Sequence, residues 1–247
     1  MKQRILWLLI FPLILWSCSS TLSPQKPSYI KYDISAQQKI DSTIWNTILP
    51  YKDSIDQNMN EVIGYSETDL QKQQPEGTLG NFVCDALLAQ SSKVYGKQID
   101  FCLVNYGGIR LPSIAKGNVT LGKIYELLPF DNMLVIQQLT GKQVQQLCDL
   151  IVLNGGWPVS GITMELGNGA AKNIYVQKQL LDTTKTYSML VSDYVANGGD
   201  KTLMLKNIPQ QNLNLLMRDA LIMYIRNLTE HDENISAKIE GRIKLSE

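Results

Sequence analysis

The stretch from residue 100 to residue 137 most constrains how this chain can fold. Residues 101–104 are a short apolar run that predicts a buried strand, and a second apolar run follows at residues 133–136. Two turns lie between them: a glycine pair at 107–108, where positive φ and close backbone approach are permitted, and residues 128–132. The stretch therefore predicts a sheet whose strands end in turns.

Three side chains beside these turns suit ligand binding. Arg110 follows the glycine pair, and Phe130 and Asn132 lie in the second turn. A cation, an aromatic face and an amide beside flexible glycines could hold a ligand with a flat ring and an anionic or hydroxylated tail. The alternative from spacing alone is a surface arginine, a core phenylalanine and two ordinary turns.

Apolar periodicity predicts the other elements of the chain. Helical spacing predicts helices at residues 34–48, 55–63, 78–89, 120–128, 140–153 and 213–228, the first of them broken by Pro50. Further strands are expected at residues 162–166, 174–176, 186–192 and 238–245. On the helix at 78–89, Asn81 and Asp85 share one face and could be catalytic or could bond loop backbone.

The first 18 residues predict an export signal rather than part of the fold. Lys2 and Arg4 precede an apolar core at residues 5–16, which is too short to span a bilayer comfortably. The residues that end at Cys18 resemble a bacterial lipobox, so we expect a lipid on Cys18 and a protein anchored to a membrane of the cell envelope, periplasmic or surface-exposed. An ordinary secretory signal is the alternative.

Composition shifts suggest four segments. We expect a lipoprotein signal peptide at 1–18, a flexible tether at 19–31, a helical linker or cap at 32–59, and one domain at 60–247. The 23 basic and 23 acidic residues balance, which argues against a nucleic-acid partner because nucleic-acid surfaces carry a basic excess.

Histidine is nearly absent, and this limits the chemistry that the chain can perform. His231 is the single histidine and lies in a polar stretch. A dinuclear phosphoesterase centre requires several histidines and aspartates, and a Ser-His-Asp or Cys-His site would need His231 itself. The sequence also contains no Walker A loop and no zinc-type Cys-x-x-Cys. We therefore expect no catalytic residue, metal or cofactor in this chain, and no hydrolysis of phosphate esters by it alone.

Six motifs, in order, resemble the C-terminal domain of the 5′-nucleotidase family. They are Gly-Asn81-Phe-Val-Cys-Asp85-Ala, Asn105-x-Gly-Gly-Ile-Arg110, Leu-Pro-Phe130-x-Asn132, Thr140-Gly-Lys, Ala196-Asn-Gly-Gly-Asp200 and Glu240-Gly-Arg-Ile-Lys. The resemblance runs from about residue 60 to residue 245. It implies an α+β fold layered as α/β/β/α with mixed β-sheets. It also implies a domain that binds the nucleoside part of a substrate, while a separate metallophosphoesterase domain carries two metals and hydrolyses it.

The resemblance also implies substrate-binding roles for individual residues. The rings of Phe130 and Tyr194 would stack on the two faces of the base, and Asn132 and Gly156 would lie near it. Asp200 would hold the ribose hydroxyls, and Arg110 would reach the phosphate. Tyr194 stands where many members have phenylalanine, which keeps a stacking face. Where members usually carry arginine upstream of the Gly-Asn helix, this chain has only Lys72, which lacks the bidentate fork.

Two cysteines match positions that are bridged in some eukaryotic relatives. The resemblance therefore predicts a Cys84–Cys102 disulfide, which would close a loop of about 19 residues and contribute roughly 3 kcal/mol. Cys148 would remain a buried thiol. Three reduced cysteines are the alternative.

These observations predict the substrate-binding part of a split 5′-nucleotidase, to which a separately encoded metallophosphoesterase would supply divalent metals. One alternative is an envelope lipoprotein that binds nucleosides or nucleotides without hydrolysing them. Another is a structural lipoprotein that has lost ligand binding.

Overall fold

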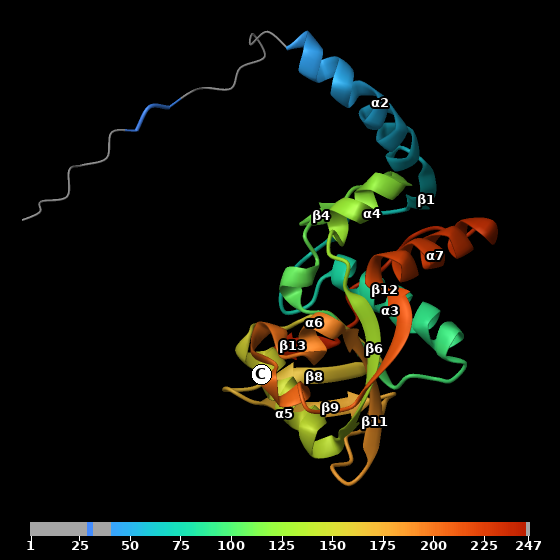
Figure 1. The fold of residues 1–247 in the computed structure, drawn as a ribbon. Helices are drawn as coiled ribbons and strands as arrows, with labels where there is room; N and C mark the ends of the chain where they lie inside the picture. Colours follow the sequence, from blue (N-terminus) through green and yellow to red (C-terminus); the bar gives the residue numbers. More distant parts are fainter. Residues whose placement is uncertain (1–28, 32–40, 246–247) are drawn as a thin grey trace, which may run out of the picture. The chain divides into compact units, whose positions relative to one another are not determined.

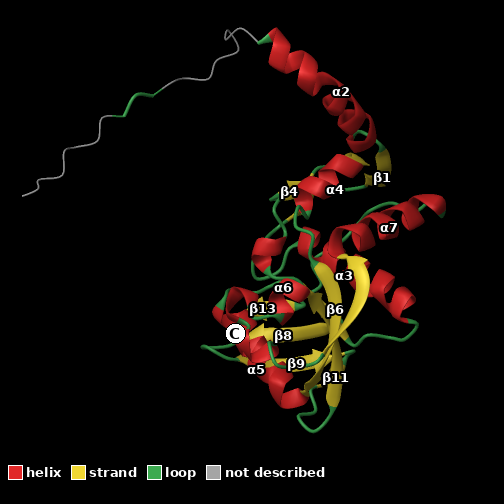
Figure 2. Ribbon diagram, in the orientation of Figure 1, coloured by secondary structure: helices red, strands yellow, loops and turns green. Residues whose placement is uncertain are grey.

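The computed structural model describes residues 29–31 and 41–245 (Figures 1 and 2). The expected signal peptide, the expected lipid attachment site Cys18 and most of the expected tether lie outside the described residues. The fold belongs to one compact unit, which runs from Thr47 to Glu247. No described helix combines the length and the apolar character needed to cross a membrane.

Helices and strands follow one another along the described residues (Figure 2). The helices are α2 (Ser42–Met59), α3 (Thr78–Tyr95), α4 (Leu121–Leu127), α5 (Gly141–Leu153), α6 (Asp193–Ala196) and α7 (Met217–Glu230), with 3-10 turns η1 (Tyr106–Gly108), η2 (Gly199–Lys201) and η3 (Leu203–Leu205). The strands are β1 (Val62–Ser66), β2 (Leu70–Gln71), β3 (Phe101–Leu103), β4 (Ser113–Ile114), β5 (Gly117–Thr120), β6 (Met133–Thr140), β7 (Val159–Ser160), β8 (Ile162–Leu166), β9 (Ala171–Val176), β10 (Gln179–Leu180), β11 (Thr186–Ser192), β12 (Gln210–Leu216) and β13 (Ile243–Leu245).

A five-stranded sheet in the order β12-β6-β11-β3-β7 separates two apolar cores. Side chains alternate across a strand, so the strands β6, β11 and β3 serve both cores. One face supplies Cys102, Leu134, Ile136 and Leu190 to the first core. The other face supplies Phe101, Leu103, Val135, Leu139, Met189 and Val191 to the second. The sheet is mixed because β3 runs parallel to β11 while the remaining pairs are antiparallel.

Helices fill the first core, and a second sheet fills the other. α3 and α7 pack on one another and supply apolar side chains to the first core. The second core is closed by α5 and by the four-stranded sheet β10-β9-β8-β13, which is also mixed (Figure 1). The predicted α+β class with mixed sheets is therefore confirmed.

One polar side chain is buried in the second core. Gln137 of β6 is fully buried and donates its amide hydrogens to the carbonyl oxygens of Leu205 and Ile208, both at 2.9 Å. These bonds fasten the η3 turn to the central sheet.

Several predicted boundaries were wrong. α2 continues through Pro50, because a missing N–H removes one helical bond and need not end the helix. The helix expected at 55–63 ends at Met59, and Ile63 lies in β1, where pairing with β5 determines its conformation. The helix expected from residue 213 starts at Met217, because the preceding residues form β12 on the sheet edge. Only Ile243–Leu245 of the last expected strand pairs, with β8.

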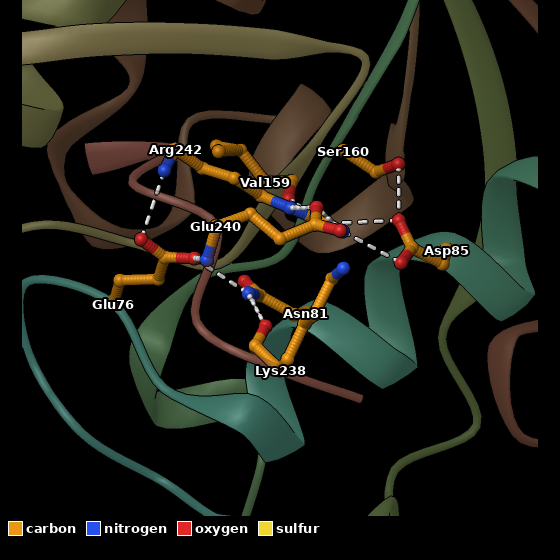
Figure 3. Close-up of polar contacts among 8 residues, drawn as sticks. All are labelled: Glu76, Asn81, Asp85, Val159, Ser160, Lys238, Glu240 and Arg242. Carbon is orange, nitrogen blue, oxygen red and sulfur yellow. Dashed lines mark hydrogen bonds and ion pairs between the residues drawn. The ribbon is translucent and has the colours of Figure 1, made fainter. Parts of the chain in front are cut away.

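A network of polar side chains joins α3 to the C-terminal segment (Figure 3). Asp85 accepts two hydrogen bonds from the guanidinium of Arg242, at 2.8 and 2.7 Å, and a third from Ser160 at 2.6 Å. Arg242 also donates to Glu240 and to the Val159 carbonyl oxygen. Burial alone would lower the pKa of Arg242, but the bonds and charges of Asp85 and Glu240 outweigh it and raise that pKa.

Glu76 and Asn81 extend this network (Figure 3). Asn81 donates to Glu76 at 2.6 Å and to the backbone oxygen of Lys238 at 2.9 Å. Glu76 also accepts from the backbone N–H groups of Glu240 and Arg242, both at 2.8 Å. Asn81 and Asp85 thus hold loop backbone and side chains together, which confirms the structural interpretation of that pair.

The expected Cys84–Cys102 bond is not formed in the structure, where both residues are free, buried thiols. Burial raises the pKa of Cys84 well above its usual value, and the neighbouring Cys102 raises it further. A protonated thiol is a poor nucleophile, so this surrounding slows thiol–disulfide exchange at the pair. Cys148 is a buried thiol as expected, and burial raises its pKa as well.

Candidate functional site

Five of the six predicted substrate-binding residues line one hollow of about 380 Å³. They are Arg110, Phe130, Asn132, Tyr194 and Asp200, and the remaining lining residues are Asn105, Gly107 and Gly108. These side chains come from three separate segments, which follow β3, precede β6 and follow β11.

The first wall is the turn after β3. Gly108 donates its N–H to the carbonyl oxygen of Asn105 at 2.9 Å. A Cβ at Gly108 would lie 2.8 Å from Oδ1 of Asn105, so only glycine lets the amide pack there. Beyond the turn, the N–H of Arg110 bonds the carbonyl oxygen of Leu127 at 2.9 Å, which joins this wall to the next.

The second wall is the loop at residues 128–132, which carries Phe130 and Asn132. Arg218 of α7 donates to the carbonyl oxygen of Leu128 at 3.3 Å and to the carboxylate of Asp131 at 2.7 Å. Met217 donates its N–H to the carbonyl oxygen of Asn132 at 2.9 Å. The start of α7 therefore holds this loop in place through three hydrogen bonds.

The third wall begins where β11 ends. Asp193 Oδ1 accepts hydrogen bonds from the N–H groups of Tyr194, at 2.8 Å, and Met133, at 3.1 Å. One carboxylate thus connects the wall that carries Tyr194 to the strand that follows the Phe130 loop.

Asp200 lies between two donors from different walls. Its Oδ2 accepts from Nδ2 of Asn105 at 2.6 Å, and its Oδ1 accepts from the hydroxyl of Tyr194 at 3.1 Å. The backbone of Asp200 is left-handed, with φ 50° and ψ 38°, which is uncommon for a residue other than glycine.

Two cations lie at the Arg110 side of the hollow. The guanidinium carbon of Arg110 lies 5.8 Å from the ring centroid of Phe130. Lys72 Nζ donates to the carbonyl oxygen of Ile109 at 2.7 Å and lies 4.0 Å from the ring centroid of Tyr106. Partial burial and, after it, repulsion from Arg110 lower the pKa of Lys72. This corner is therefore electropositive.

Gly156 does not reach the hollow. Its φ is +101°, and a Cβ there would lie 2.6 Å from the carbonyl oxygen of Pro75. Its own carbonyl oxygen accepts from Nε2 of Gln74 at 2.8 Å. The structure thus places Gly156 in a contact with the segment before α3.

Sequence reasoning missed two residues that shape the site. Asn105 belongs to one of the six motifs but was not among the predicted binding residues. Its position directly after an apolar strand could have indicated a site residue. Arg218 gave no such signal because its partners lie about 90 residues away in sequence.

The lining groups can bind a ligand through stacking, hydrogen bonds and charge. The hollow presents two aromatic rings, two amides, a carboxylate and a guanidinium. The single histidine, His231, is exposed at the end of α7, where its Nδ1 lies 2.7 Å from the carbonyl oxygen of Asn227. Within residues 29–31 and 41–245, no group of three or more His, Cys, Asp and Glu side chains could hold a metal ion.

Comparison with known proteins gives consistent results. Residues 62–207 match the family described as 5′-nucleotidase, C-terminal domain. The trifunctional nucleotide phosphoesterase protein YfkN of Bacillus subtilis (strain 168) is 29% identical over an alignment of 216 residues, and the match covers 78% of this chain and 14% of YfkN. A 5′-nucleotidase of Vibrio vulnificus (strain CMCP6) is 28% identical over 172 residues, which are 68% of this chain and 31% of that protein.

A solved structure shares the fold. The 5′-nucleotidase precursor of Thermus thermophilus superposes with a TM-score of 0.69 at 30% identity, over 81% of this chain and 42% of that one. The chain thus spans less than half the length of each of these three relatives. Since the family match covers residues 62–207, more than half of the sequence, the chain belongs to the 5′-nucleotidase family through that family's C-terminal domain.

Proposed function

We propose that this domain binds a nucleoside or nucleotide in the hollow and presents it to a separate metallophosphoesterase. The observation that carries the proposal is the convergence of Arg110, Phe130, Asn132, Tyr194 and Asp200 on one hollow. These residues are far apart in sequence, and membership of the 5′-nucleotidase family gives the ligand class.

The two aromatic rings would hold the base. Phe130 is 48% exposed and Tyr194 is 47% exposed, so both offer a face to a ligand. Stacking of a base on an aromatic side chain is worth about 1–3 kcal/mol. Asn132 would add a hydrogen bond to the edge of the base, because an amide can both donate and accept.

The remaining groups suit the sugar and the phosphate. The carboxylate of Asp200 would accept hydrogen bonds from ribose hydroxyls. Arg110 would orient a phosphate, with Lys72 adding positive charge beside it. Lys72 already bonds the Ile109 carbonyl oxygen, and lysine lacks the fork of arginine, so we expect a weak preference for nucleotide over nucleoside.

Hydrolysis would depend on the partner. The 247 residues contain one histidine, which is too few for a two-metal phosphoesterase centre. Under this proposal a separate metallophosphoesterase would supply the divalent metals. The contribution of this chain would be to fix the substrate beside those metals, which lowers the entropic part of the barrier. A lipid on Cys18 would keep the protein at the cell envelope.

Calorimetric titration of the purified full chain with adenosine and AMP tests the binding site. We expect saturable binding of both ligands, and we expect Phe130→Ala or Tyr194→Ala to weaken each by at least about tenfold. Tyr175→Ala is the matched control, because Tyr175 is a 40% exposed aromatic residue that does not line this hollow. Absence of heat with both ligands would refute the proposed site.

A second candidate function is a binding lipoprotein that presents its ligand to no enzyme. The single histidine is as compatible with this function as with the split enzyme. The two are separated by adding Mn²⁺ and a metallophosphoesterase encoded beside this gene, and measuring phosphate released from AMP. Release that requires both chains and falls with Phe130→Ala supports the split enzyme. Release by the partner at the same rate without this chain supports the binding lipoprotein.

A further inference from the structure

The hydroxyl of Tyr194 makes a contact that base stacking does not require. A phenylalanine would offer the same flat face to a base. In this chain the hydroxyl donates a hydrogen bond to Oδ1 of Asp200 at 3.1 Å. One side chain therefore touches both the place proposed for the base and the group proposed for the sugar.

The position of the Tyr194 ring is fixed by its neighbours. A Cβ built on Gly199 would lie 2.4, 2.5 and 2.7 Å from three ring carbons, so the ring rests directly against the backbone at Gly199. Because Gly199 blocks that side, the exposed part of the ring faces the hollow that it lines. The hydroxyl consequently points in one direction, toward Asp200.

The carboxylate of Asp200 is held at both oxygens. Asn105, which is 5% exposed, donates to Oδ2 at 2.6 Å from the opposite wall. An ionised carboxylate has about four acceptor positions, so each oxygen retains a free one for a ligand hydroxyl. Two neighbouring hydroxyls of a ribose present two donors in one plane, which matches two oxygens held side by side.

Without its donors the carboxylate would turn. The terminal torsion of aspartate has a broad energy well, so hydrogen bonds and not the rotamer define its plane. The backbone of Asp200 is left-handed, a conformation that is unfavourable for this residue type and is kept only because the surrounding contacts hold it. Loss of the Tyr194 hydroxyl would free Oδ1 while the bond from Asn105 remained.

We propose that Tyr194 is a specificity-determining residue whose hydroxyl positions Asp200 to read the 2′,3′-diol of ribose. This inference rests on the proposed function and adds a selection among ligands: the site prefers ribonucleosides to analogues without these hydroxyls. Tyr194 acts on the sugar through Asp200, so for the sugar it is a positioning residue.

Tyr194→Phe in the full chain is the direct test, with adenosine and 2′,3′-dideoxyadenosine as probes in calorimetric titrations. We expect the variant to bind adenosine about tenfold more weakly, the scale expected for loss of a hydrogen bond to a charged group. Binding of the dideoxy analogue should change by less than about twofold, because the ring face is kept. Tyr175→Phe, outside the hollow, should leave both affinities unchanged.

A double-mutant cycle with Asp200→Asn shows whether Tyr194 acts through this carboxylate. We expect Tyr194→Phe to cause no further loss of adenosine affinity in the Asp200→Asn background. Equal losses for adenosine and the dideoxy analogue, or an undiminished effect in that background, would overturn the inference. Phe130→Ala distinguishes failure of this inference from failure of the proposed function. If Phe130→Ala abolishes binding while Tyr194→Phe leaves the ratio of the adenosine and dideoxyadenosine affinities unchanged, the proposed function stands and this inference fails. Failure of the unaltered chain to bind adenosine would overturn both.

Discussion

At the scale of single residues, Arg218 illustrates support from outside the hollow. It is buried, lies with its guanidinium carbon 4.2 Å from the ring centroid of Tyr125, and bonds Leu128 and Asp131 on either side of Phe130. A ring that is fixed before the ligand arrives loses less entropy on binding than one on a free loop. If the hollow binds the proposed ligand, Arg218 would contribute to affinity without touching it.

We predict that Arg218→Met weakens adenosine binding by about tenfold, because methionine keeps the apolar stem but removes both bonds to the loop. Calorimetry measures the affinity, and circular dichroism checks that the fold is retained. Arg226→Met is the control: Arg226 lies on the same helix but pairs with Glu61, away from the hollow. An unchanged affinity in a folded Arg218→Met protein would contradict this account.

The family resemblance gave six candidate site residues, five of which line one hollow, and sequence analysis failed where contacts join distant segments. The Gly107–Gly108 turn was recognisable from its own residues, because turn chemistry is local. Gly156 was assigned from the family resemblance, although its positive φ serves a contact with Pro75. Arg218 could not be recognised, because an arginine on an amphipathic helix is usually solvent-exposed.

At the scale of elements, the apolar spacing within a segment and its pairing with a neighbouring strand together determine whether it forms a helix or a strand. The helix at residues 140–153 was predicted closely and is observed as Gly141–Leu153, because its apolar spacing and its cap agree. Residues 213–216 had helical spacing as well, but Leu216 pairs with Met133 of β6 beyond an irregular stretch, and these residues form the end of β12. Periodicity describes one segment, whereas a strand needs a neighbour that the sequence does not reveal.

The start of α5 provides an element-scale prediction. The hydroxyl of Thr140 accepts from the N–H of Gln143, and the Gln143 side chain accepts from the N–H of Thr140, which forms a capping box. Thr140→Ala should lower the free energy of unfolding by about 1 kcal/mol, as measured by urea denaturation. Thr140→Ser keeps the hydroxyl and should retain most of the stability. Equal losses in the two variants would show that the cap is not the cause.

At the scale of the whole molecule, the Arg242 network fastens the end of the chain to its middle. Arg242 bonds Asp85 of α3 and the carbonyl oxygen of Val159 in β7, while Glu76 holds the backbone of the same segment. Through these bonds the first core, the central sheet and the C-terminal strand are connected. The motif match implied that Glu240-Gly-Arg mattered, but its partners became visible only in three dimensions.

We predict that Arg242→Met lowers the global free energy of unfolding by about 3 kcal/mol, because it leaves the carboxylates of Asp85 and Glu240 facing each other without a cation. Arg242→Lys should recover only part of the loss, since lysine cannot bond both oxygens of Asp85 at once. Urea denaturation gives the stabilities. Arg226→Met removes an exposed pair with Glu61 and should cost less than about 1 kcal/mol. A similar cost at the two arginines would contradict a structural role for the network.

The two-sided central sheet has a consequence for how β6 finds its alignment. Leu134, Val135 and Ile136 are consecutive aliphatic residues, so sliding the strand by one position would still deliver aliphatic side chains to both cores. Apolar burial alone therefore does not distinguish the correct alignment from its nearest competitor. Gln137 distinguishes it from the alignment that would put Ile136 in its place, because the carbonyl oxygens of Leu205 and Ile208 would then lose their two hydrogen bonds. A single buried amide thus excludes an arrangement that the aliphatic residues would accept.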